Sequence, residues 1–451
     1  MNYIIKNATL VNEGTTTLAS VVISDGRIEK IVPGRDARPC VSTETIIDAE
    51  GLYLIPGVID EHVHFREPGL TQKADIYSES RAAVAGGVTS FMDMPNTVPQ
   101  TTTIEALQQK FATAAQKSAA NYSFYLGATN ENIDEIKKID PKKVCGVKLF
   151  MGSSTGNMLV NEDEAMIRLF NESPCLIAAH CEDEQIIHAN TVCCKDLASK
   201  GEVVADAGIH PFVRTTEACY KSTAKAVDMA TKFGAKLHVL HISTKSELTL
   251  FRNDIQLKNK KITAETCPHY LTFCDKDYDE KGFAIKCNPA IKMASDRDIL
   301  RKAIIDGHID TIGTDHAPHL WREKFTDDYF TAKSGFPSIQ NSLDMMLNLY
   351  HQGLISFEQI VKLMCHNPAE LYQVKDRGFI REGYYADLVL VDLNHEKVIK
   401  NDDMLYKCGW TPYDGMKAKS QVTHTFVNGK LVYHDGIVEE NIIGQPLEFD
   451  R

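Results

Sequence analysis

The stretch "IDEHVHFREPG", Ile59 to Gly69, begins like a buried strand and then places polar residues at short, regular spacing. His62 and His64 are one residue apart, and Arg66 follows two residues later. Side chains of a strand alternate between its faces, so these three side chains are predicted to point the same way. Two imidazoles on one face need a common cation or another shared partner. The stretch therefore predicts a polar site at the end of a buried strand.

The chain around this stretch alternates apolar, β-branched runs with helical stretches. Helices are predicted within residues 76–87, 104–116, 162–170, 216–234, 297–307 and 338–350. Eight runs read as buried strands: "GVIDEHVHF", "VTSFMDMP", "YSFYLGAT", "VCGVKLFM", "CLIAAHCE", "KLHVLHIS", "KITAETCP" and "IDTIGTDH". A doubly wound sheet is the alternative, but the count of eight favours an α/β fold of the (β/α)8 TIM-barrel type.

The two ends of the chain have a different pattern. Residues 1–55 and 373–451 contain short strands, with Asp25-Gly26 and Asn428-Gly429 at predicted hairpin turns. Neither end has enough apolar residues for a core of its own. Because domain termini often lie close together, we expect both ends to form one small β-sandwich domain. Residues 56–372 are then expected to form the barrel, and the metal-dependent catalytic domain that the residues below suggest.

Composition narrows the class of protein. The 451 residues are 43% hydrophobic and 24% charged, as in globular domains, and the net charge of −12 without a basic run argues against nucleic acid as a partner. Twelve cysteines without a CxxC pair predict reduced thiols. No run resembles a signal peptide or a membrane span. We expect a cytoplasmic protein that acts on a small molecule, and homo-oligomer formation is left open.

Six of the eight predicted strands carry a polar residue near or just beyond their C-terminal end. In a TIM barrel these strand ends form the active site. Imidazole and carboxylate ligands suit Zn²⁺ best, with Mn²⁺, Co²⁺ or Fe²⁺ as alternatives. Four histidines and one aspartate exceed the needs of one tetrahedral ion, so two divalent ions are expected. The residues, in strand order, are His62 and His64, Asn96, Lys148, His180, His241 and Asp315.

Lys148 does not fit this set as an ammonium, because it would repel two cations. A lysine amine that has captured CO₂ becomes a carbamate, which is an anionic bridge with two oxygens. The alternative is a surface or salt-bridged lysine, and the apolar neighbours Val147, Leu149 and Phe150 argue against it. Four other histidines are predicted to be structural or loop residues: His188, His210, His238 and His269.

Taken together, these motifs resemble those of dihydroorotases, in the cyclic-amidohydrolase group of the amidohydrolase superfamily. "DEHVHFREPG" and "TDHAPH" resemble the two dihydroorotase signatures, and "MPNT" and "CNPAIK" match further motifs. The resemblance covers essentially the whole chain. It implies a first metal held by His62, His64 and Asp315, and a second held by His180 and His241. It also implies that carboxylated Lys148 bridges them with a hydroxide, and that the substrate binds to Arg66, Asn96, Asn288 and His319.

The implied reaction is reversible cyclisation of N-carbamoyl-L-aspartate to L-dihydroorotate in pyrimidine synthesis, with Asp315 carrying the proton. Two motifs leave the substrate open: "GVKLFMG" also resembles hydantoinases and allantoinases, and "ETCPHYL" resembles allantoinase. Arg66 and Asn96 favour dihydroorotate, because allantoinases and hydantoinases generally differ at those positions. The alternatives are an allantoinase or dihydropyrimidinase and, more remotely, a non-catalytic scaffold.

The segment after the eighth predicted strand, "HLWREKFTDDYFTAKSGFPSIQ", is long for a loop between a strand and a helix. Such a segment acts as a lid over the active site in some enzymes. An ordinary surface excursion is the equally plausible alternative.

Overall fold

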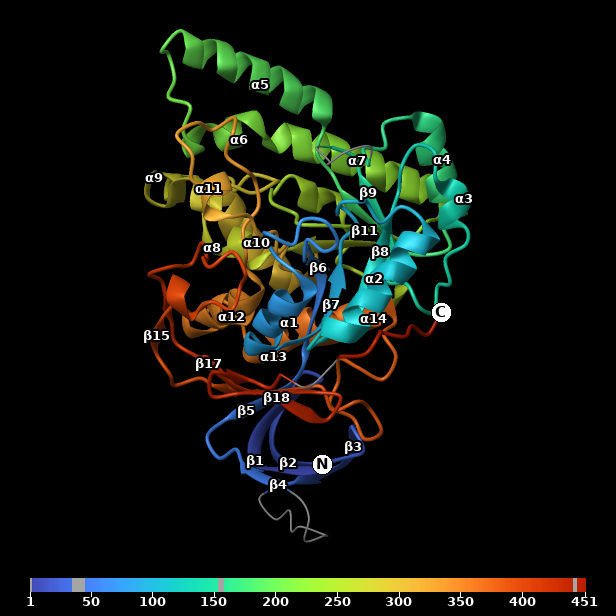
Figure 1. Ribbon diagram of the computed structural model, residues 1–451, viewed down its shortest axis with the longest axis vertical. Helices are drawn as coiled ribbons and strands as arrows, with labels where there is room; N and C mark the ends of the chain where they lie inside the picture. Colours follow the sequence, from blue (N-terminus) through green and yellow to red (C-terminus); the bar gives the residue numbers. More distant parts are fainter. Residues whose placement is uncertain (1, 35–44, 153–157, 441–443) are drawn as a thin grey trace.

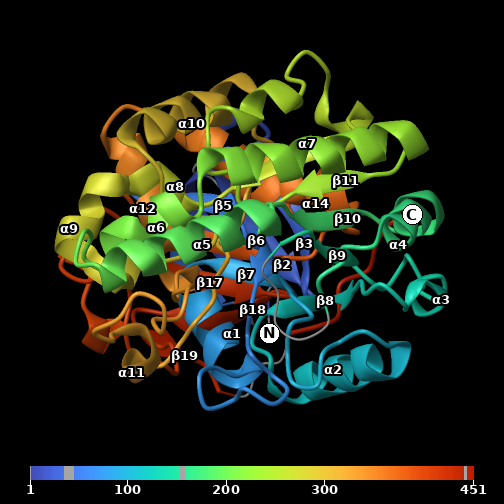
Figure 2. The same ribbon diagram turned by 90° about the horizontal axis from the view of Figure 1, so that it is seen from above.

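The computed structural model describes residues 2–34, 45–152, 158–440 and 444–451. Its centre is an eight-stranded parallel sheet whose strands follow one another in chain order. Seen from above, helices surround these strands (Figure 2). Each predicted run overlaps one strand, which confirms the barrel. The strands are β6 Val58–Val63, β7 Val88–Asp93, β8 Asn121–Gly127, β9 Gly146–Phe150, β10 Ile177–His180, β11 Leu237–Val239, β12 Ile262–Thr266 and β13 Thr311–Ile312.

The barrel closes where its first and last strands meet. The His64 backbone N–H donates to the His316 carbonyl at 2.7 Å. The Thr314 N–H and hydroxyl both donate to the Asp60 carboxylate, at 3.1 and 2.6 Å. We call these contacts between β6 and residues 314–316 the seam of the barrel. The seam places the histidines after Asp60 beside Asp315.

Helices cover the outside of the barrel. Every residue of β6 to β10 is buried, as expected for parallel strands covered on both faces. The helix α5 extends beyond the rim of the barrel (Figure 1). No helix in the described part of the chain is long and apolar enough to cross a membrane. The longer helices are α1 Ile76–Ala85, α2 Ile104–Lys117, α4 Asp163–Glu172, α5 Glu184–Ser199, α7 Thr216–Phe233, α10 Ala294–Asp306 and α12 Ser342–His351.

Short helices complete the loops and the outer layer. They are α3 Ile133–Ile136, α6 His210–Val213, α8 Pro268–Thr272, α9 Tyr278–Lys281, α11 Trp321–Lys324, α13 Phe357–Val361 and α14 Asn367–Tyr372. All six predicted helical stretches contain a helix. The side chain of Asp75 caps α1 by accepting from the Ser78 N–H, and that of Thr215 caps α7 by accepting from the Ala218 N–H.

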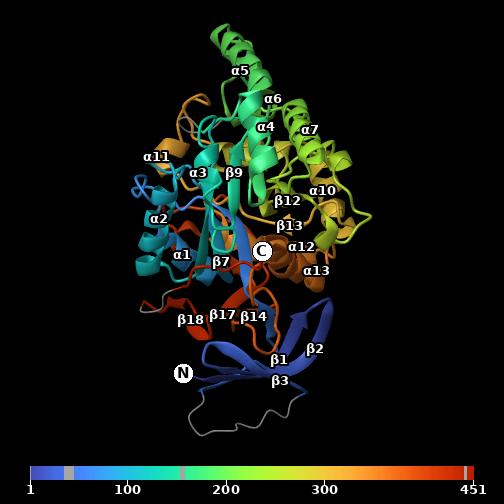
Figure 3. The same cartoon turned by 90° about the vertical axis from the view of Figure 1, so that its right-hand side faces the viewer.

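Both ends of the chain join in one nine-stranded sheet beneath the barrel (Figure 3). The N-terminal β5 pairs with the C-terminal β14, and Gly57 alone separates β5 from β6. The predicted association of the two ends is confirmed, whereas the domain boundaries at residues 55 and 373 stay a prediction. The strands are β1 Tyr3–Asn12, β2 Thr15–Ser24, β3 Arg27–Pro33, β4 Thr45–Asp48, β5 Tyr53–Pro56, β14 Leu388–Asp392, β17 Gln421–Val427, β18 Lys430–His434 and β19 Ile437–Val438; β15 Lys397–Val398 and β16 Lys417–Ala418 form a separate pair.

The two predicted hairpin turns are present and pack against each other. Asp25, Gly26, Asn428 and Gly429 all have positive φ, between 49° and 83°. A Cβ atom on Gly429 would lie 2.5 Å from the Gly26 Cα, so only glycine fits at this close approach. One turn from each end of the chain therefore fixes how the two ends meet.

Candidate functional site

All ten residues predicted for the site line one cavity of about 510 Å³ at the mouth of the barrel. They come from segments spread over more than half of the chain, and the barrel topology brings them together. The residues are His62, His64, Arg66, Asn96, Lys148, His180, His241, Asn288, Asp315 and His319.

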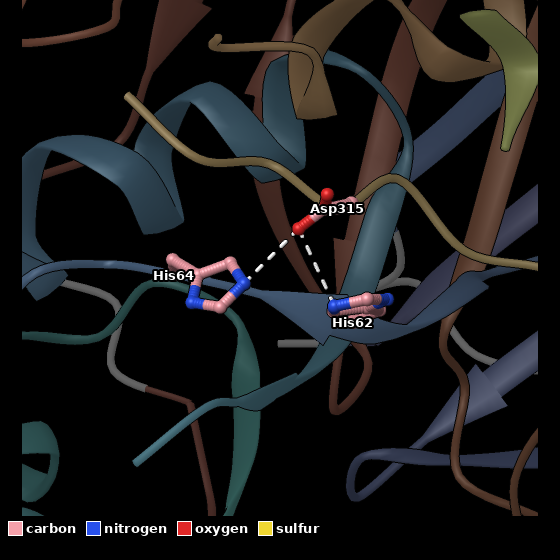
Figure 4. Close-up of side chains that lie close together, drawn as sticks. All are labelled: His62, His64 and Asp315. Carbon is pink, nitrogen blue, oxygen red and sulfur yellow. Dashed lines mark ion pairs between the residues drawn. The ribbon is translucent and has the colours of Figure 1, made fainter. Parts of the chain in front are cut away.

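His62, His64 and Asp315 form the first group. Nε2 of His62 lies 3.3 Å from Asp315 Oδ1, and Nε2 of His64 lies 3.0 Å from the same oxygen (Figure 4). Burial opposes ionisation of Asp315, but the two imidazoles hold the pKa of its carboxyl well below the usual value. Burial also lowers the pKa of both histidines, which favours the neutral form in which an imidazole nitrogen can bind a metal ion. Their ligand atoms lie within 4.8 Å of one another, as a divalent cation requires.

His180 and His241 form the second group. Nδ1 of His180 lies 2.9 Å from Nε2 of His241. His241 follows β11 by two residues and has a φ of +44°, which directs its ring toward β10. Two imidazole nitrogens at this distance need a proton or a cation between them. A second metal ion fits this pair.

Three of the four imidazoles have a polar partner on the nitrogen that is not directed at another predicted ligand. Such partners fix the ring and leave the other nitrogen for a metal ion. Two of these contacts are hydrogen bonds, His62 Nδ1 with Glu265 Oε1 at 2.8 Å and His64 Nδ1 with Asn96 Oδ1 at 2.7 Å. The third is a close approach of His180 Nε2 to Glu182 Oε2, at 3.0 Å, that does not have hydrogen-bond geometry. Within the described residues, His241 Nδ1 is buried without a hydrogen-bond partner.

Glu265 and Glu182 are functional neighbours that sequence reasoning missed. Glu265 lies on β12, and it also accepts the His241 backbone N–H at 3.0 Å, so it contacts both histidine groups. Glu182 pairs with Arg214; burial opposes its ionisation, but the guanidinium holds the pKa of Glu182 at about 2. The sequence did contain a signal for both residues, because each is a carboxylate inside or directly after a run of apolar residues that predicts a buried strand.

Lys148 lies in the middle of β9 and is 1% exposed. Its amine is 4.7 Å from the Phe150 ring centroid, and in the described part of the chain it has no hydrogen bond or ion pair. The reading as a surface or salt-bridged lysine therefore does not fit. Burial lowers the pKa of Lys148 to about 8. A larger neutral fraction favours attack of the amine on CO₂, so this lysine fits a carbamate.

Arg66 faces the cavity for a different reason than the one predicted. β6 ends at Val63, so strand alternation does not extend to Arg66. The residue has a φ of +65°, and its Nε–H donates to the Pro318 carbonyl at 3.1 Å. Arg66 is buried, and no carboxylate of the described residues forms an ion pair with it.

The other predicted substrate residues line the same cavity as Arg66. His319 Nε2 lies 3.3 Å from Arg66 Nη2. Because Oδ1 of Asn96 accepts from His64, its Nδ2 remains to donate to a substrate. Oδ1 of Asn288 has no hydrogen-bond partner in the described part of the chain. This side of the cavity can bind an anionic, hydrogen-bonding group.

The long segment after β13 forms a wall of the cavity with its residues 330–335. Two buried lysine amines hold this wall. Lys324 Nζ donates to the carbonyls of Lys333 and Gly335, at 3.1 and 2.8 Å, and Lys286 Nζ donates to those of Tyr329 and Ala332, both at 2.6 Å. The segment is therefore part of the cavity, and lid motion stays a prediction.

Three of the four histidines predicted to be structural or loop residues are buried in the protein interior. His238 bonds Thr263 at 2.8 Å, and His210 bonds the Tyr329 hydroxyl and the Cys287 carbonyl, both at 2.7 Å. His269 is buried against Tyr270 and Phe336. His188 is exposed on α5. None of the four lines the cavity.

Comparison with known proteins agrees with this geometry. Residues 53–432 match the Amidohydrolase family. The chain is 31% identical to a dihydroorotase of Methanosarcina acetivorans, covering 98% of this chain and 93% of the relative. It is 31% identical to an allantoinase of Bacillus velezensis over 96% and 94%. The L-hydantoinase structure from Arthrobacter aurescens is 28% identical, covers 99% of both chains and has a TM-score of 0.92. The chain therefore belongs to the amidohydrolase family, as a cyclic amidohydrolase enzyme.

Proposed function

We propose that the chain is a dihydroorotase, which interconverts N-carbamoyl-L-aspartate and L-dihydroorotate in pyrimidine synthesis. The observation that carries this proposal is Arg66, a buried guanidinium in the cavity without an internal carboxylate partner in the described residues. A buried charge needs a partner, and the carboxylate of dihydroorotate would supply one. Asn96, Asn288 and His319 supply further hydrogen-bonding groups in the same cavity.

The residues of the cavity fit two divalent cations, with Zn²⁺ favoured by the nitrogen and oxygen donors. His62, His64 and Asp315 would hold the first, His180 and His241 the second, and the carbamate of Lys148 would join them. When bound, such cations acidify a water molecule and polarise the amide carbonyl of the ring.

Asp315 is the proposed proton carrier. Both of its histidine contacts involve Oδ1, which leaves Oδ2 for proton transfer. In ring opening, Asp315 takes the proton of the attacking water and delivers it to the departing ring nitrogen. Ring closure runs through the same steps in reverse. Arg66 binds the substrate carboxylate and holds the amide carbon in the cavity throughout.

A second candidate is another cyclic amidohydrolase. The chain is 31% identical to an allantoinase and 31% identical to a dihydroorotase, in both cases over nearly the whole chain. Sequence identity therefore supports the two candidates equally. The two differ in the substrate, because allantoin and dihydrouracil lack the carboxylate that Arg66 would bind.

The test is the turnover of the metal-loaded protein with dihydroorotate, N-carbamoyl-L-aspartate, allantoin, hydantoin and dihydrouracil, with the metal content measured on the same sample. We expect the highest kcat/KM for dihydroorotate and its ring-opened product. Preference for allantoin, hydantoin or dihydrouracil would overturn the proposal. Full metal content without turnover of any of them would support the scaffold reading.

A further inference from the structure

Lys73 lies in the loop after β6, and neither the metal chemistry nor the predicted substrate residues account for it. It is buried, with 8% of its surface exposed. Its amine lies 3.1 Å from Nδ1 of His319 and 3.1 Å from Oε1 of Glu323. His319 therefore lies between two cationic side chains, Lys73 on one ring nitrogen and Arg66 on the other.

The protonation of His319 is constrained by these neighbours. Burial, together with the charges of Arg66 and Lys73, lowers the pKa of His319 to about 3, so its ring is neutral. A neutral imidazole donates from one nitrogen and accepts at the other, whereas an ammonium and a guanidinium can only donate. His319 can thus accept from only one of its two cationic neighbours.

The shorter of the two contacts favours Lys73 as the donor. The Lys73 contact at 3.1 Å is shorter than the Arg66 contact at 3.3 Å. If Nδ1 accepts from Lys73, the proton of the ring is on Nε2, where it faces the donors of Arg66. Two donors that face each other need an acceptor beside them, and a carboxylate has two acceptor oxygens.

We propose that Lys73 is a positioning residue for the substrate carboxylate. It donates to Nδ1 of His319 and so fixes the Nε2–H tautomer, and His319 and Arg66 then donate together to one carboxylate. The substrate part of this inference rests on the proposed dihydroorotase function, whereas the tautomer does not.

Removing Lys73 has a specific expected consequence. Oε2 of Glu323 lies 3.8 Å from the same nitrogen of His319 and is an acceptor. In Lys73→Met the ring proton should therefore move to Nδ1, toward Glu323. Nε2 then accepts from Arg66, and the substrate loses the His319 donor as well as part of the Arg66 guanidinium.

The experiment combines nitrogen NMR of histidine-labelled, metal-loaded protein with steady-state kinetics. His319 is assigned by its missing signal in His319→Gln. We expect the Nε2–H tautomer in the wild type and in Lys73→Arg, and the Nδ1–H tautomer in Lys73→Met. The KM for dihydroorotate should rise about 10- to 100-fold in Lys73→Met, as for a lost hydrogen bond to a charged group, with kcat nearly unchanged. The slow turnover of dihydrouracil should not change.

The matched control is Lys407→Met, since Lys407 pairs with Asp75 at 2.6 Å and does not line the cavity. It should leave the tautomer and the KM unchanged. An unchanged His319 tautomer in Lys73→Met overturns the inference, and so do equal losses for both substrates or a loss of metal. If the wild type does not turn over dihydroorotate, the proposed function is wrong. The NMR comparison of the His319 tautomer would still test the role of Lys73 independently of the substrate.

Discussion

The two histidine groups of the cavity differ in the charge they contain. His62 and His64 converge on a carboxylate oxygen of Asp315. His180 and His241 face each other. Among the described residues, no third histidine, carboxylate or thiol completes a metal-ligand cluster with them. Glu182 approaches the outer nitrogen of His180 and is paired with Arg214, and Glu265 accepts only the backbone N–H of His241.

This difference indicates that the two groups depend on different residues. Two neutral imidazoles with a carboxylate can neutralise part of the charge of a divalent cation, and two imidazoles alone cannot. The first group therefore carries its own anion, whereas the second needs one from elsewhere. In the cavity, carboxylated Lys148 is the group proposed to supply it.

The largest effect is expected for Lys148→Ala, which removes the proposed shared anion. The second group should lose its metal and the first should keep most of its own, so the metal content should fall from two ions toward one per chain. We expect kcat to fall more than about 10³-fold, because activation of water by the pair of metals is lost. Metal analysis and steady-state rates measure both changes.

Short-chain carboxylates added to Lys148→Ala should restore part of the metal and of the rate. Two tightly bound metals and a wild-type rate in this variant would show that Lys148 is not the bridge. Equal loss from both histidine groups would break the comparison between them.

Asp315→Asn is expected to have the next largest effect. The amide keeps an oxygen that can coordinate a cation but cannot accept the proton. We expect much of the metal to remain and kcat to fall about 10²-fold or more. Rates and metal content measured on one preparation separate the two roles. A near-normal kcat with full metal would assign proton transfer to another group.

Arg66→Met sharpens the comparison from the substrate side, because Arg66 pairs with no carboxylate of the described residues, whereas Arg214 pairs with Glu182. We expect kcat/KM for dihydroorotate to fall about 10²- to 10³-fold, as for one partner removed from a buried charge pair. Metal content should stay constant. Dihydrouracil is the control substrate, and its turnover should fall much less. Equal losses on both substrates would mean that Arg66 supports the structure of the site.

The smallest effects are expected for substitutions of Glu182 and Glu265, the carboxylates next to His180 and His62. Glu182→Gln should weaken the second metal, and Glu265→Gln chiefly the first, each by about 10- to 100-fold in affinity. Competition with a chelator measures the two affinities. The control is Glu247→Gln, since Glu247 is buried and bonds Thr223 and Thr244 but no predicted ligand. The same loss in all three variants would indicate general destabilisation.

The sequence predicted the barrel well because each strand is a local apolar run that packing buries on both faces. It also placed the candidate ligands in one cavity, because side chains at the ends of parallel strands meet at one mouth. His62, His64, His180 and Asp315 could be named from their position at the ends of such runs.

The backbone and the supporting contacts could not be predicted in this way. Positive φ at Arg66, His241 and Asp315 is rare for residues other than glycine, and tertiary contacts rather than local sequence determine it. Glu265 and Lys73 act on side chains from other segments, so spacing along the chain gives no signal of their partners.

The seam of the barrel gives the first group of ligands a further role. Thr314 donates to the His62 carbonyl across 252 residues of chain. A cation held by His62, His64 and Asp315 would cross-link the first and last strands at the same place. Closing the long loop between these strands costs chain entropy, and the binding of the cation would offset that cost. The free energy of unfolding should therefore grow with the free metal concentration by mass action. Loading the catalytic metal would then also be a late step in assembling the barrel, and the backbone N–H of His64 would report it by hydrogen exchange.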